Sequence, residues 1–369
     1  MFIGICGSIC AGRATVAQYL IEHHGFKFVY VYKDSTGKGQ NGTENGTAGL
    51  PQDTACIPLN GDDRSELQPQ ELSVPKLHPR HMQGFPSTDA LLEFITKRWR
   101  QRWVTTDIAS EAILDMYSRR PFFLLISIDA PLGVRLRRHL QVQGMDNHNP
   151  SAMSLEDFAA ESDNQLYDPK HGQITLMSRA SVRLINTSPD LAHLYATLSK
   201  VDLINPDRLR PSWDTYFMAL ASLAAQRSNC MKRRVGCVLV REKRVISTGY
   251  NGTPRGLVNC SDGGCGRCND ALGSGHGLTT CLCLHAEENA LLEAGRERIR
   301  EGAILYCDTC PCLTCSIKIA QVGIGEVVYS QGYSMDGETA DVFRQAGVKL
   351  RQFVPPPNGL IHLEKLELY

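Results

Sequence analysis

Apolar residues after residue 211 recur first at helical spacing and then in strand-like runs. The helical positions are Trp213, Phe217, Leu220 and Ala224. Ser212 precedes them and can act as an N-cap, so we expect a helix to begin there. Apolar runs at 235–241 and 244–250 then flank the two-residue turn Glu242-Lys243. This arrangement predicts a β-hairpin.

The rest of this half alternates helical and strand patterns. Helices are expected to start at His285 and Cys312 and to cover 339–345, with strands over 303–307, 326–330 and 348–353. The resulting order, α-β-β-α-β-α-β-α-β, predicts a mixed sheet between two layers of helices, with the first two strands antiparallel. The fold class is therefore α/β, with a three-layer α/β/α domain in the C-terminal half.

The N-terminal half starts with an apolar strand pattern, 2–6, a glycine-containing loop, 7–15, and a helical pattern that ends near Gly25. Strand, loop and helix in this order are typical of a phosphate-binding loop. However, Arg13 and Ala14 stand where such a loop has Lys and Ser or Thr. We expect a degenerate P-loop.

Two further segments support an α/β domain over residues 1–207. A buried-type strand and an arginine-rich helix cover 124–142, and a strand ends near 185–188. With the altered loop, these segments resemble small-molecule kinases of the dephospho-coenzyme A and nucleoside monophosphate kinase type. An active phosphotransferase and a domain that only packs or assembles are the alternatives. Residues 34–80 are rich in Gly, Asn and Thr, so we interpret them as a flexible insertion.

Length and charge limit the possible functions. A chain of 369 residues fits about two domains, and prolines near 206–211 place the boundary so that the second covers 208–369. Because 39 basic residues balance 39 acidic ones, no net charge favours nucleic acid. The sequence lacks an 18-residue apolar run and a signal-peptide pattern, so we expect no membrane partner and a cytoplasmic or also nuclear protein.

Two short motifs contain the candidate chemistry. His285-Ala286-Glu287 is followed, 24 residues after Glu287, by Pro311-Cys312-Leu313-Thr314-Cys315. An imidazole and two thiolates, from His285, Cys312 and Cys315, suit a catalytic zinc that keeps a fourth position open. This order, H-x-E and then P-C-x-x-C, is the signature of zinc nucleobase deaminases, in which the glutamate carries protons and is not a ligand. A structural zinc or a reduced cysteine pair is the alternative.

Cysteines also gather before His285. Of the 14 cysteines, all but Cys6, Cys10 and Cys56 lie beyond residue 229. In a reducing compartment we expect such cysteines to bind metal rather than to form disulfides. We predict a second, structural zinc with four ligands, and His276 or Cys283 as possible substitutes. The four ligands are Cys260, Cys265, Cys268 and Cys281. Reduced loop cysteines are the alternative.

Three segments identify a family resemblance: 227–237, 249–256 and the run Cys-Leu-His-Ala-Glu-Glu-Asn-Ala that contains His285. Over residues 211–353 the chain resembles the deoxycytidylate (dCMP) deaminases, in their fungal form with an N-terminal extension. The resemblance implies a cytidine-deaminase-like fold and hydrolysis of dCMP to dUMP and ammonia, which feeds thymidylate synthesis. It also implies a homohexamer that dCTP activates and dTTP inhibits.

The resemblance suggests substrate contacts at three positions. Asn251 matches a position that contacts the deoxyribose, although an Asn-Gly pair also suits a plain turn. Arg227 is a candidate for the 5′-phosphate because a guanidinium fork fits a phosphate dianion, although a solvated charge at a helix end is the simpler interpretation. Tyr333 is a candidate wall of the substrate pocket.

Other functions fit the sequence less well. An assembly module stabilised by zinc has no use for the Glu287 carboxylate. A deaminase acting on RNA would be expected to have a basic, aromatic-rich groove, and only 7% of the residues are aromatic. Deamination of free cytidine and an active N-terminal kinase remain as alternatives.

Overall fold

The structure is a computed structural model, and it describes residues 1–32, 82–143, 153–270, 276–332 and 336–363. The predicted insertion 34–80 and Tyr333 lie outside these ranges. Two compact units divide the chain: Met1–Arg210 together with Pro357–Tyr369, and Pro211–Pro356. The chain therefore passes into the second unit at residue 211 and returns to the first after residue 356.

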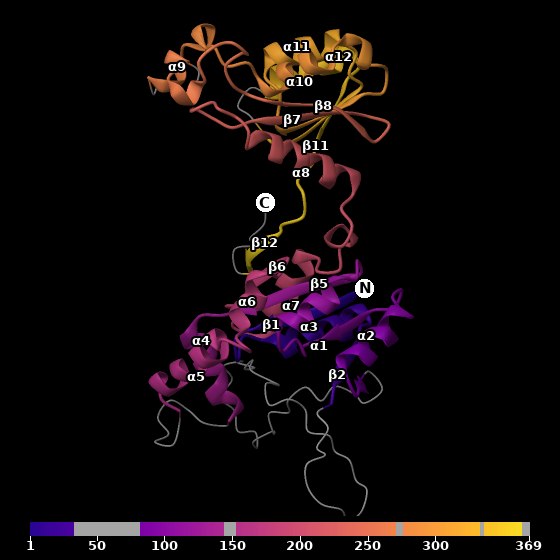
Figure 1. The fold of residues 1–369 in the computed structure, drawn as a ribbon, viewed down its shortest axis with the longest axis vertical. Coiled ribbons are helices and arrows are strands. Elements are labelled where there is room, and N and C mark those ends of the chain that lie inside the picture. Colours follow the sequence, from indigo (N-terminus) through magenta and orange to yellow (C-terminus); the bar gives the residue numbers. More distant parts are fainter. Residues whose placement is uncertain (33–81, 144–152, 271–275, 333–335, 364–369) are drawn as a thin grey trace, which may run out of the picture. The chain divides into compact units, whose positions relative to one another are not determined.

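The first unit contains one parallel sheet with helices on both faces (Figure 1). Its described elements are β1 (Phe2–Gly7), α1 (Arg13–His24), β2 (Lys27–Val31), β3 (Met82–Phe85), α2 (Thr88–Thr96), β4 (Trp103–Thr105), α3 (Glu111–Ser118), β5 (Phe123–Asp129), α4 (Leu132–Val142), α5 (Leu155–Tyr167), α6 (Gln173–Ser178), β6 (Val182–Ile185), α7 (Leu191–Val201) and β12 (Gly359–His362). The strand order is β12-β6-β5-β1-β4-β2-β3, and all described pairings are parallel.

Strand β1 shows why this sheet is covered on both faces. All six of its residues are buried, as expected for a central parallel strand. Ile3 and Ile5 pack in one core with α1 and α7, whereas Phe2 and Cys6 pack in a second core with α2, α3 and α6. The sequence predicted this strand and the helix after the glycine loop, but did not predict the last strand.

That last strand changes the predicted extent of the second domain. Strand β12 pairs in parallel with β6, and Ile361 and Leu363 are buried in the core beneath α1 and α7. Residues 357–369 thus belong with the first unit, although the prediction placed everything from 208 to 369 in the second. The sequence pattern missed β12 because four residues are too few to show a periodicity.

The second unit is a five-stranded mixed sheet, with α8 on one face and α10, α11 and α12 on the other (Figure 1). Its elements are α8 (Trp213–Ala225), β7 (Gly236–Arg241), β8 (Arg244–Tyr250), α9 (Gly266–Asn269), α10 (Ala286–Ala294), β9 (Ile304–Thr309), α11 (Leu313–Gln321), β10 (Glu326–Gln331), α12 (Asp336–Ala346) and β11 (Lys349–Gln352). Short 3-10 turns of this unit lie at 260–262, 278–280 and 296–298, and another, at 206–208, belongs to the first unit.

The strand order β11-β10-β9-β7-β8 confirms the predicted three-layer architecture. Strands β7 and β8 are antiparallel, as are β7 and β9, whereas β9, β10 and β11 are parallel. Glu242 and Lys243 both have positive φ angles, 52° and 61°, which a two-residue hairpin turn of type I′ requires. Along β7, Cys237 and Leu239 face α10, and Val238 and Val240 face α8.

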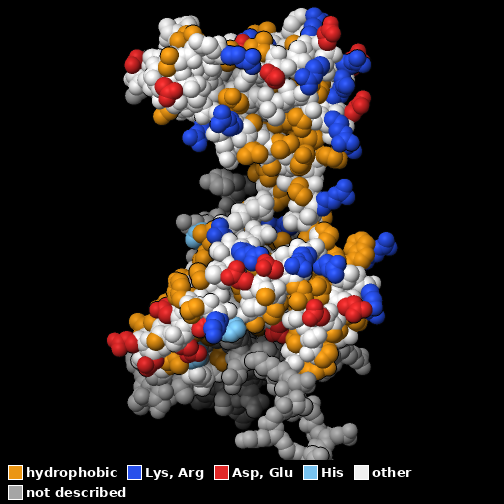
Figure 2. All heavy atoms as spheres, viewed as in Figure 1, with side chains coloured by type: hydrophobic (Ala, Val, Ile, Leu, Met, Phe, Trp, Pro, Cys, Tyr) orange, Lys and Arg blue, Asp and Glu red, His pale blue; other side chains and the backbone are white. Residues whose placement is uncertain are grey.

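The outer face of α8 is apolar. Trp213, Tyr216 and Leu223 are 47%, 46% and 58% exposed, and apolar side chains gather in this region in Figure 2. An exposed patch of this kind is typical of a surface that contacts another protein.

Within the described ranges, no helix is both long enough and apolar enough to cross a bilayer.

Candidate active site

Two helix starts bring the predicted ligands together. His285 is the residue before α10, Cys312 is the residue before α11, and Cys315 lies in the first turn of α11. The His285 Nδ1 atom lies 3.3 Å from the Sγ atoms of both Cys312 and Cys315. The structure therefore groups the three ligands that the sequence motifs predicted.

The spacing of these atoms fits a zinc ion. With Zn–N near 2.0–2.1 Å and Zn–S near 2.3 Å, a tetrahedral site has an N···S edge of about 3.6 Å, close to the observed separation. The ligand atoms of His285, Cys312 and Cys315 all lie within 4.8 Å of one another. Hydrogen bonds from the Cys315 thiol and from His285 lower the pKa of the Cys312 thiol to about 3, so Cys312 is a thiolate at neutral pH.

Glu287 lies in the first turn of α10 and is only 4% exposed. Burial raises the pKa of its carboxyl group to about 7, while the nearby positive charge of His285 opposes that rise. The charge on Cys312 also acts on this carboxyl, and the charge of Glu287 acts in turn on the Cys315 thiol, so Glu287 interacts electrostatically with all three ligands. A carboxyl with a pKa near neutrality can both accept and release a proton at neutral pH.

Helix α10 is held against β8 by close backbone packing. A Cβ atom on Gly249 would lie 2.1 Å from the Ala286 carbonyl oxygen, so only glycine allows the helix to approach this strand. Ser247 Oγ donates a hydrogen bond to the Ala290 carbonyl oxygen at 2.8 Å, and Asn289 Nδ2 donates to the Tyr250 carbonyl oxygen at 2.9 Å. These contacts fix the start of the helix, where His285 and Glu287 lie.

Helix α11 is held by a hydrogen bond from α12 and an ion pair with α10. Thr339 Oγ1 in α12 is buried and donates to the Pro311 carbonyl oxygen at 3.0 Å. Lys318 and Glu288 form an ion pair at 2.6 Å that joins α11 to α10. Helix α11 is therefore tied to both α10 and α12.

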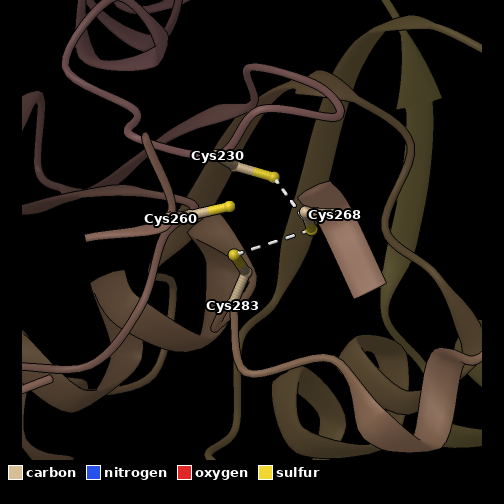
Figure 3. A group of neighbouring side chains, drawn as sticks. All are labelled: Cys230, Cys260, Cys268 and Cys283. Atoms are coloured by element: carbon tan, nitrogen blue, oxygen red, sulfur yellow. Dashed lines mark hydrogen bonds between the residues drawn. The ribbon is translucent and has the colours of Figure 1, made fainter. Parts of the chain in front are cut away.

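Six cysteines form a second cluster, beside α9. Cys230, Cys260, Cys268 and Cys283 make one group of mutually close sulfurs, drawn in Figure 3. A second group consists of Cys265, Cys268, Cys281 and Cys283. The predicted set, Cys260, Cys265, Cys268 and Cys281, is thus divided between two groups, and the side chain of His276 belongs to neither.

Cys230 was missing from the prediction because it lies 30 residues before Cys260 in the sequence. Two contacts bring them together: Asn229 Nδ2 donates to Asn259 Oδ1 at 2.8 Å, and the Met231 N–H donates to Cys260 Sγ at 3.4 Å. The only sequence signal was the excess of cysteines over the ligands of a single catalytic zinc.

Known proteins resemble this chain, one of them over nearly its whole length. The family described as "Cytidine and deoxycytidylate deaminase zinc-binding region" matches residues 211–331. The deoxycytidylate deaminase of Schizosaccharomyces pombe is 46% identical over 97% of this chain and 99% of its own. The chain belongs to the deoxycytidylate deaminase family. The deoxycytidylate deaminase of Saccharomyces cerevisiae is 45% identical over 76% of this chain and 90% of its own length. That of Mycobacterium phage D29 is 46% identical over 32% of this chain and 95% of its own length.

The three residues that the deoxycytidylate deaminase resemblance suggests as substrate contacts differ in their surroundings in the structure. The Asn251 amide is buried: its Oδ1 accepts from the Val235 N–H at 2.8 Å and from Ser228 Oγ at 2.7 Å, and its Nδ2 donates to the Arg233 carbonyl oxygen at 2.7 Å. These bonds hold the 228–235 loop in place. Arg227 is exposed just after α8, and Tyr333 lies outside the described residues.

Arg233 was not among the residues that the sequence predicted to contact the substrate. Its Nη2 atom donates to Thr309 Oγ1 at 3.2 Å and to Gln331 Oε1 at 3.3 Å, at the carboxyl ends of β9 and β10. Asp308, the neighbour of Thr309, accepts from the Gly236 N–H at 3.1 Å through Oδ2. Its Oδ1 has no protein partner, and burial raises the pKa of its carboxyl group. Ligands of α/β sheets bind at such strand ends.

Proposed function

We infer that this protein catalyses the hydrolytic deamination of dCMP to dUMP and ammonia, the reaction that supplies dUMP for thymidylate synthesis. The observation that carries this inference is a buried glutamate, Glu287, beside His285, Cys312 and Cys315 in a chain 46% identical to a deoxycytidylate deaminase over nearly its full length. A zinc-stabilised assembly module would not need this buried carboxyl.

The roles of the side chains follow from their chemistry. His285, Cys312 and Cys315 would hold the zinc ion, which supplies a nucleophile at neutral pH by acidifying water. Glu287 would take a proton from the attacking water and pass it to ring nitrogen N3, which makes C4 more electrophilic. As the water oxygen bonds to C4, Glu287 would take the second proton of that oxygen and deliver it to the amino group; the C4–N bond then breaks, ammonia leaves and the oxygen remains as the C4 carbonyl of dUMP. The pKa of about 7 allows Glu287 to perform both transfers.

Ammonia release from four substrates tests this proposal: dCMP, deoxycytidine, cytidine and CMP. We expect the purified protein to deaminate dCMP far faster than deoxycytidine or cytidine, at a kcat/KM ratio of at least about 100, because a site built to bind a phosphate loses those contacts with a nucleoside. CMP keeps the phosphate, so its rate tests instead whether the site rejects a 2′-hydroxyl. Equal rates with cytidine and dCMP would contradict the assignment and favour a nucleoside deaminase.

The family resemblance also supports regulation and assembly. We propose that dCTP activates the protein, that dTTP inhibits it and that it forms a homohexamer in the cytoplasm or also the nucleus. The exposed apolar face of α8, with Trp213, Tyr216 and Leu223, offers area for contacts between subunits. Light scattering together with rates measured in dCTP and dTTP tests these proposals, and a monomer with effector-independent rates would contradict them.

Substrate contacts remain proposals. We propose that Asn251 borders the deoxyribose and that Arg227 binds the 5′-phosphate, with Tyr333 as a wall of the pocket. If Arg227 binds the phosphate, Arg227→Gln should raise the KM for dCMP without changing that for deoxycytidine. An equal change with both substrates would instead favour a structural effect.

We propose that the first unit is a nucleotide-kinase-like domain with a degenerate P-loop. A side chain occupies a loop donor that would otherwise be open to a phosphate: Gln165 Oε1 accepts from the Ile9 N–H at 2.9 Å. Asn186 Nδ2 donates to the Ala11 carbonyl oxygen at 2.9 Å and fixes the loop from its other side. This supports a relic domain over an active phosphotransferase. ATP turnover by the full chain tests it, and phosphate transfer at an enzymatic rate would contradict the relic.

We also propose that zinc at the catalytic site is accompanied by structural zinc in the cysteine cluster near α9. Free thiols at this density are otherwise exposed to oxidation, whereas a closed four-thiolate site is inert and adds to folding stability.

A further inference from the structure

Six cysteines contribute to the cluster, two more than one tetrahedral ion can bind. Cys230, Cys260, Cys268 and Cys283 have sulfurs that all lie within 4.8 Å of one another, and the same holds for Cys265, Cys268, Cys281 and Cys283. Cys268 and Cys283 are members of both groups; Figure 3 shows them within the first group. The sulfurs therefore occupy the corners of two four-membered groups that share one edge.

The distances match those of a metal-thiolate cluster. A Zn–S bond of about 2.3 Å gives a tetrahedron with S···S edges of about 3.8 Å. Cys268 Sγ lies 3.8 Å from Cys230 Sγ, 3.8 Å from Cys281 Sγ and 3.9 Å from Cys283 Sγ, and Cys265 Sγ lies 4.0 Å from Cys281 Sγ. The described cysteines are all free of disulfides, so these spacings are open to metal.

Hydrogen-bond donors around the cluster suit sulfurs that are ionised as thiolates. The Met231 N–H donates to Cys260 Sγ at 3.4 Å, and the Leu282 N–H donates to Cys265 Sγ at 3.4 Å. Arg267 Nη1 donates to Cys281 Sγ at 3.5 Å and brings a positive charge to the cluster. Hydrogen bonds of this kind orient and stabilise thiolate ligands in metal sites.

We propose that the six cysteines bind two zinc ions in one cluster, with Cys268 and Cys283 as bridging thiolates shared by both ions. Cys230 and Cys260 complete one tetrahedron, and Cys265 and Cys281 complete the other. Binding two Zn²⁺ releases the protons of six thiols, and no electron transfer is involved. The cluster thus goes beyond a single structural zinc and brings the zinc content to three ions per chain.

The proposed cluster adjoins the catalytic ligands. Cys283 lies two residues before His285, and Leu284 between them exchanges two backbone hydrogen bonds with Gly252, at 2.8 and 3.2 Å. The cluster therefore anchors the segment from which α10 starts. We expect it to act as a positioning element for His285 and not to touch the substrate.

Metal analysis of the purified full chain by mass spectrometry tests the proposal. We expect three zinc ions per chain in the wild type, two in Cys265→Ser, two in Cys230→Ser and one in Cys268→Ser. Cys10→Ser, in the first unit, is the matched control and should keep three. Two ions in the wild type with no loss in Cys265→Ser would overturn the two-ion cluster, and loss of only one ion in Cys268→Ser would overturn the bridging.

A second measurement covers variants that fail to fold. In wild-type protein loaded with cadmium-113, two resonances that show mutual scalar coupling are expected, because coupling between the ions needs a shared sulfur. Uncoupled resonances would overturn the proposal. The double variant Cys312→Ser/Cys315→Ser should lose one ion and its deaminase activity while it keeps the coupled pair. Deaminase activity and the coupled resonances are separate readouts, so a result against the deaminase function can be told apart from a result against the cluster.

Discussion

At the scale of the residue, the active site depends on where one carboxyl lies. Glu287 and Glu288 are neighbours in the first turn of α10, but Glu287 is 4% exposed whereas Glu288 pairs with Lys318 at the surface. Burial raises the pKa of Glu287 to about 7, which prepares this carboxyl for proton transfer at neutral pH.

The two neighbours form a matched pair of variants. Glu287→Gln should lower kcat for dCMP by at least about 100-fold, because positioned proton transfer contributes about 100 to 10,000-fold, and should keep the catalytic zinc. Glu288→Gln should stay within a few-fold of the wild type. Ammonia release and metal analysis of both variants measure this, and a Glu287→Gln enzyme with wild-type turnover would disprove the assigned role.

How far the sequence predicts the site depends on how local the signal is. His285, Glu287, Cys312 and Cys315 lie in two short motifs whose spacing fixes their place at helix starts, so all four could be predicted. Cys230 could not, because a loop contact between Asn229 and Asn259 brings it to the cluster. Arg233 was missed for the same reason: its partners lie at the ends of two later strands.

At the scale of the element, the packing of α10 on β8 positions the catalytic groups. Gly249→Ala would place a methyl group 2.1 Å from the Ala286 carbonyl oxygen, so the helix must move. We expect a loss of about 1–3 kcal/mol in the free energy of unfolding and a lower kcat. Denaturant titration and ammonia release measure both.

Gly337 in α12 provides the control, since an added Cβ there meets nothing within 4 Å. Gly337→Ala should leave activity unchanged and add about 0.5–1 kcal/mol of stability, because alanine favours the helix. If Gly249→Ala were as active and as stable as Gly337→Ala, the close approach of α10 to β8 would not be what positions His285 and Glu287.

A second element contact depends on pH. Arg351 in β11 donates two hydrogen bonds to Asp214 in α8, at 2.8 and 3.1 Å, and Tyr306 donates a third to the same carboxylate at 2.8 Å. The hydrogen bonds from Arg351 lower the pKa of Asp214 below its ordinary value of 3.8. Because the folded pKa is the lower one, this stabilisation is present above pH 3.8 and is lost as the pH falls through the folded pKa.

Asp214→Asn should therefore lower the free energy of unfolding by on the order of 1–2 kcal/mol at pH 7, and by less as the pH approaches and passes below 3.8. Arg344→Gln, which removes an exposed pair with Asp341, is the control and should change stability by less than about 0.5 kcal/mol. Denaturant titrations at several pH values measure both, and a pH-independent difference for Asp214→Asn would contradict this account.

At the scale of the whole molecule, the last strand ties the C-terminus to the first unit. Periodicity predicted nearly every helix and strand of the second unit because those elements have clear apolar faces. It could not predict that the chain returns to the first sheet, because pairing of β12 with β6 joins residues more than 170 positions apart in the sequence.

Substitutions of Leu363 and Leu360 test whether β12 completes the core of the first unit. Leu363 is 1% exposed in the core of the first unit and Leu360 is 54% exposed. Leu363→Ala should destabilise the first unit by about 2–5 kcal/mol, and Leu360→Ala by less than about 1 kcal/mol. Calorimetry of the full chain should show the thermal transition of the first unit lowered by Leu363→Ala alone and dCMP deamination unchanged in both. Equal effects of the two changes would mean that β12 does not complete that core.

The position of β12 also sets the order in which the protein is completed on the ribosome. Strands β1 to β6 emerge first, yet their sheet stays one strand short until residues 359–362 leave the exit tunnel. The second unit, Pro211–Pro356, has by then been fully synthesised. The sheet that is started first is therefore completed only after the second unit has been made, and a nascent chain stalled before residue 359 carries an open sheet edge.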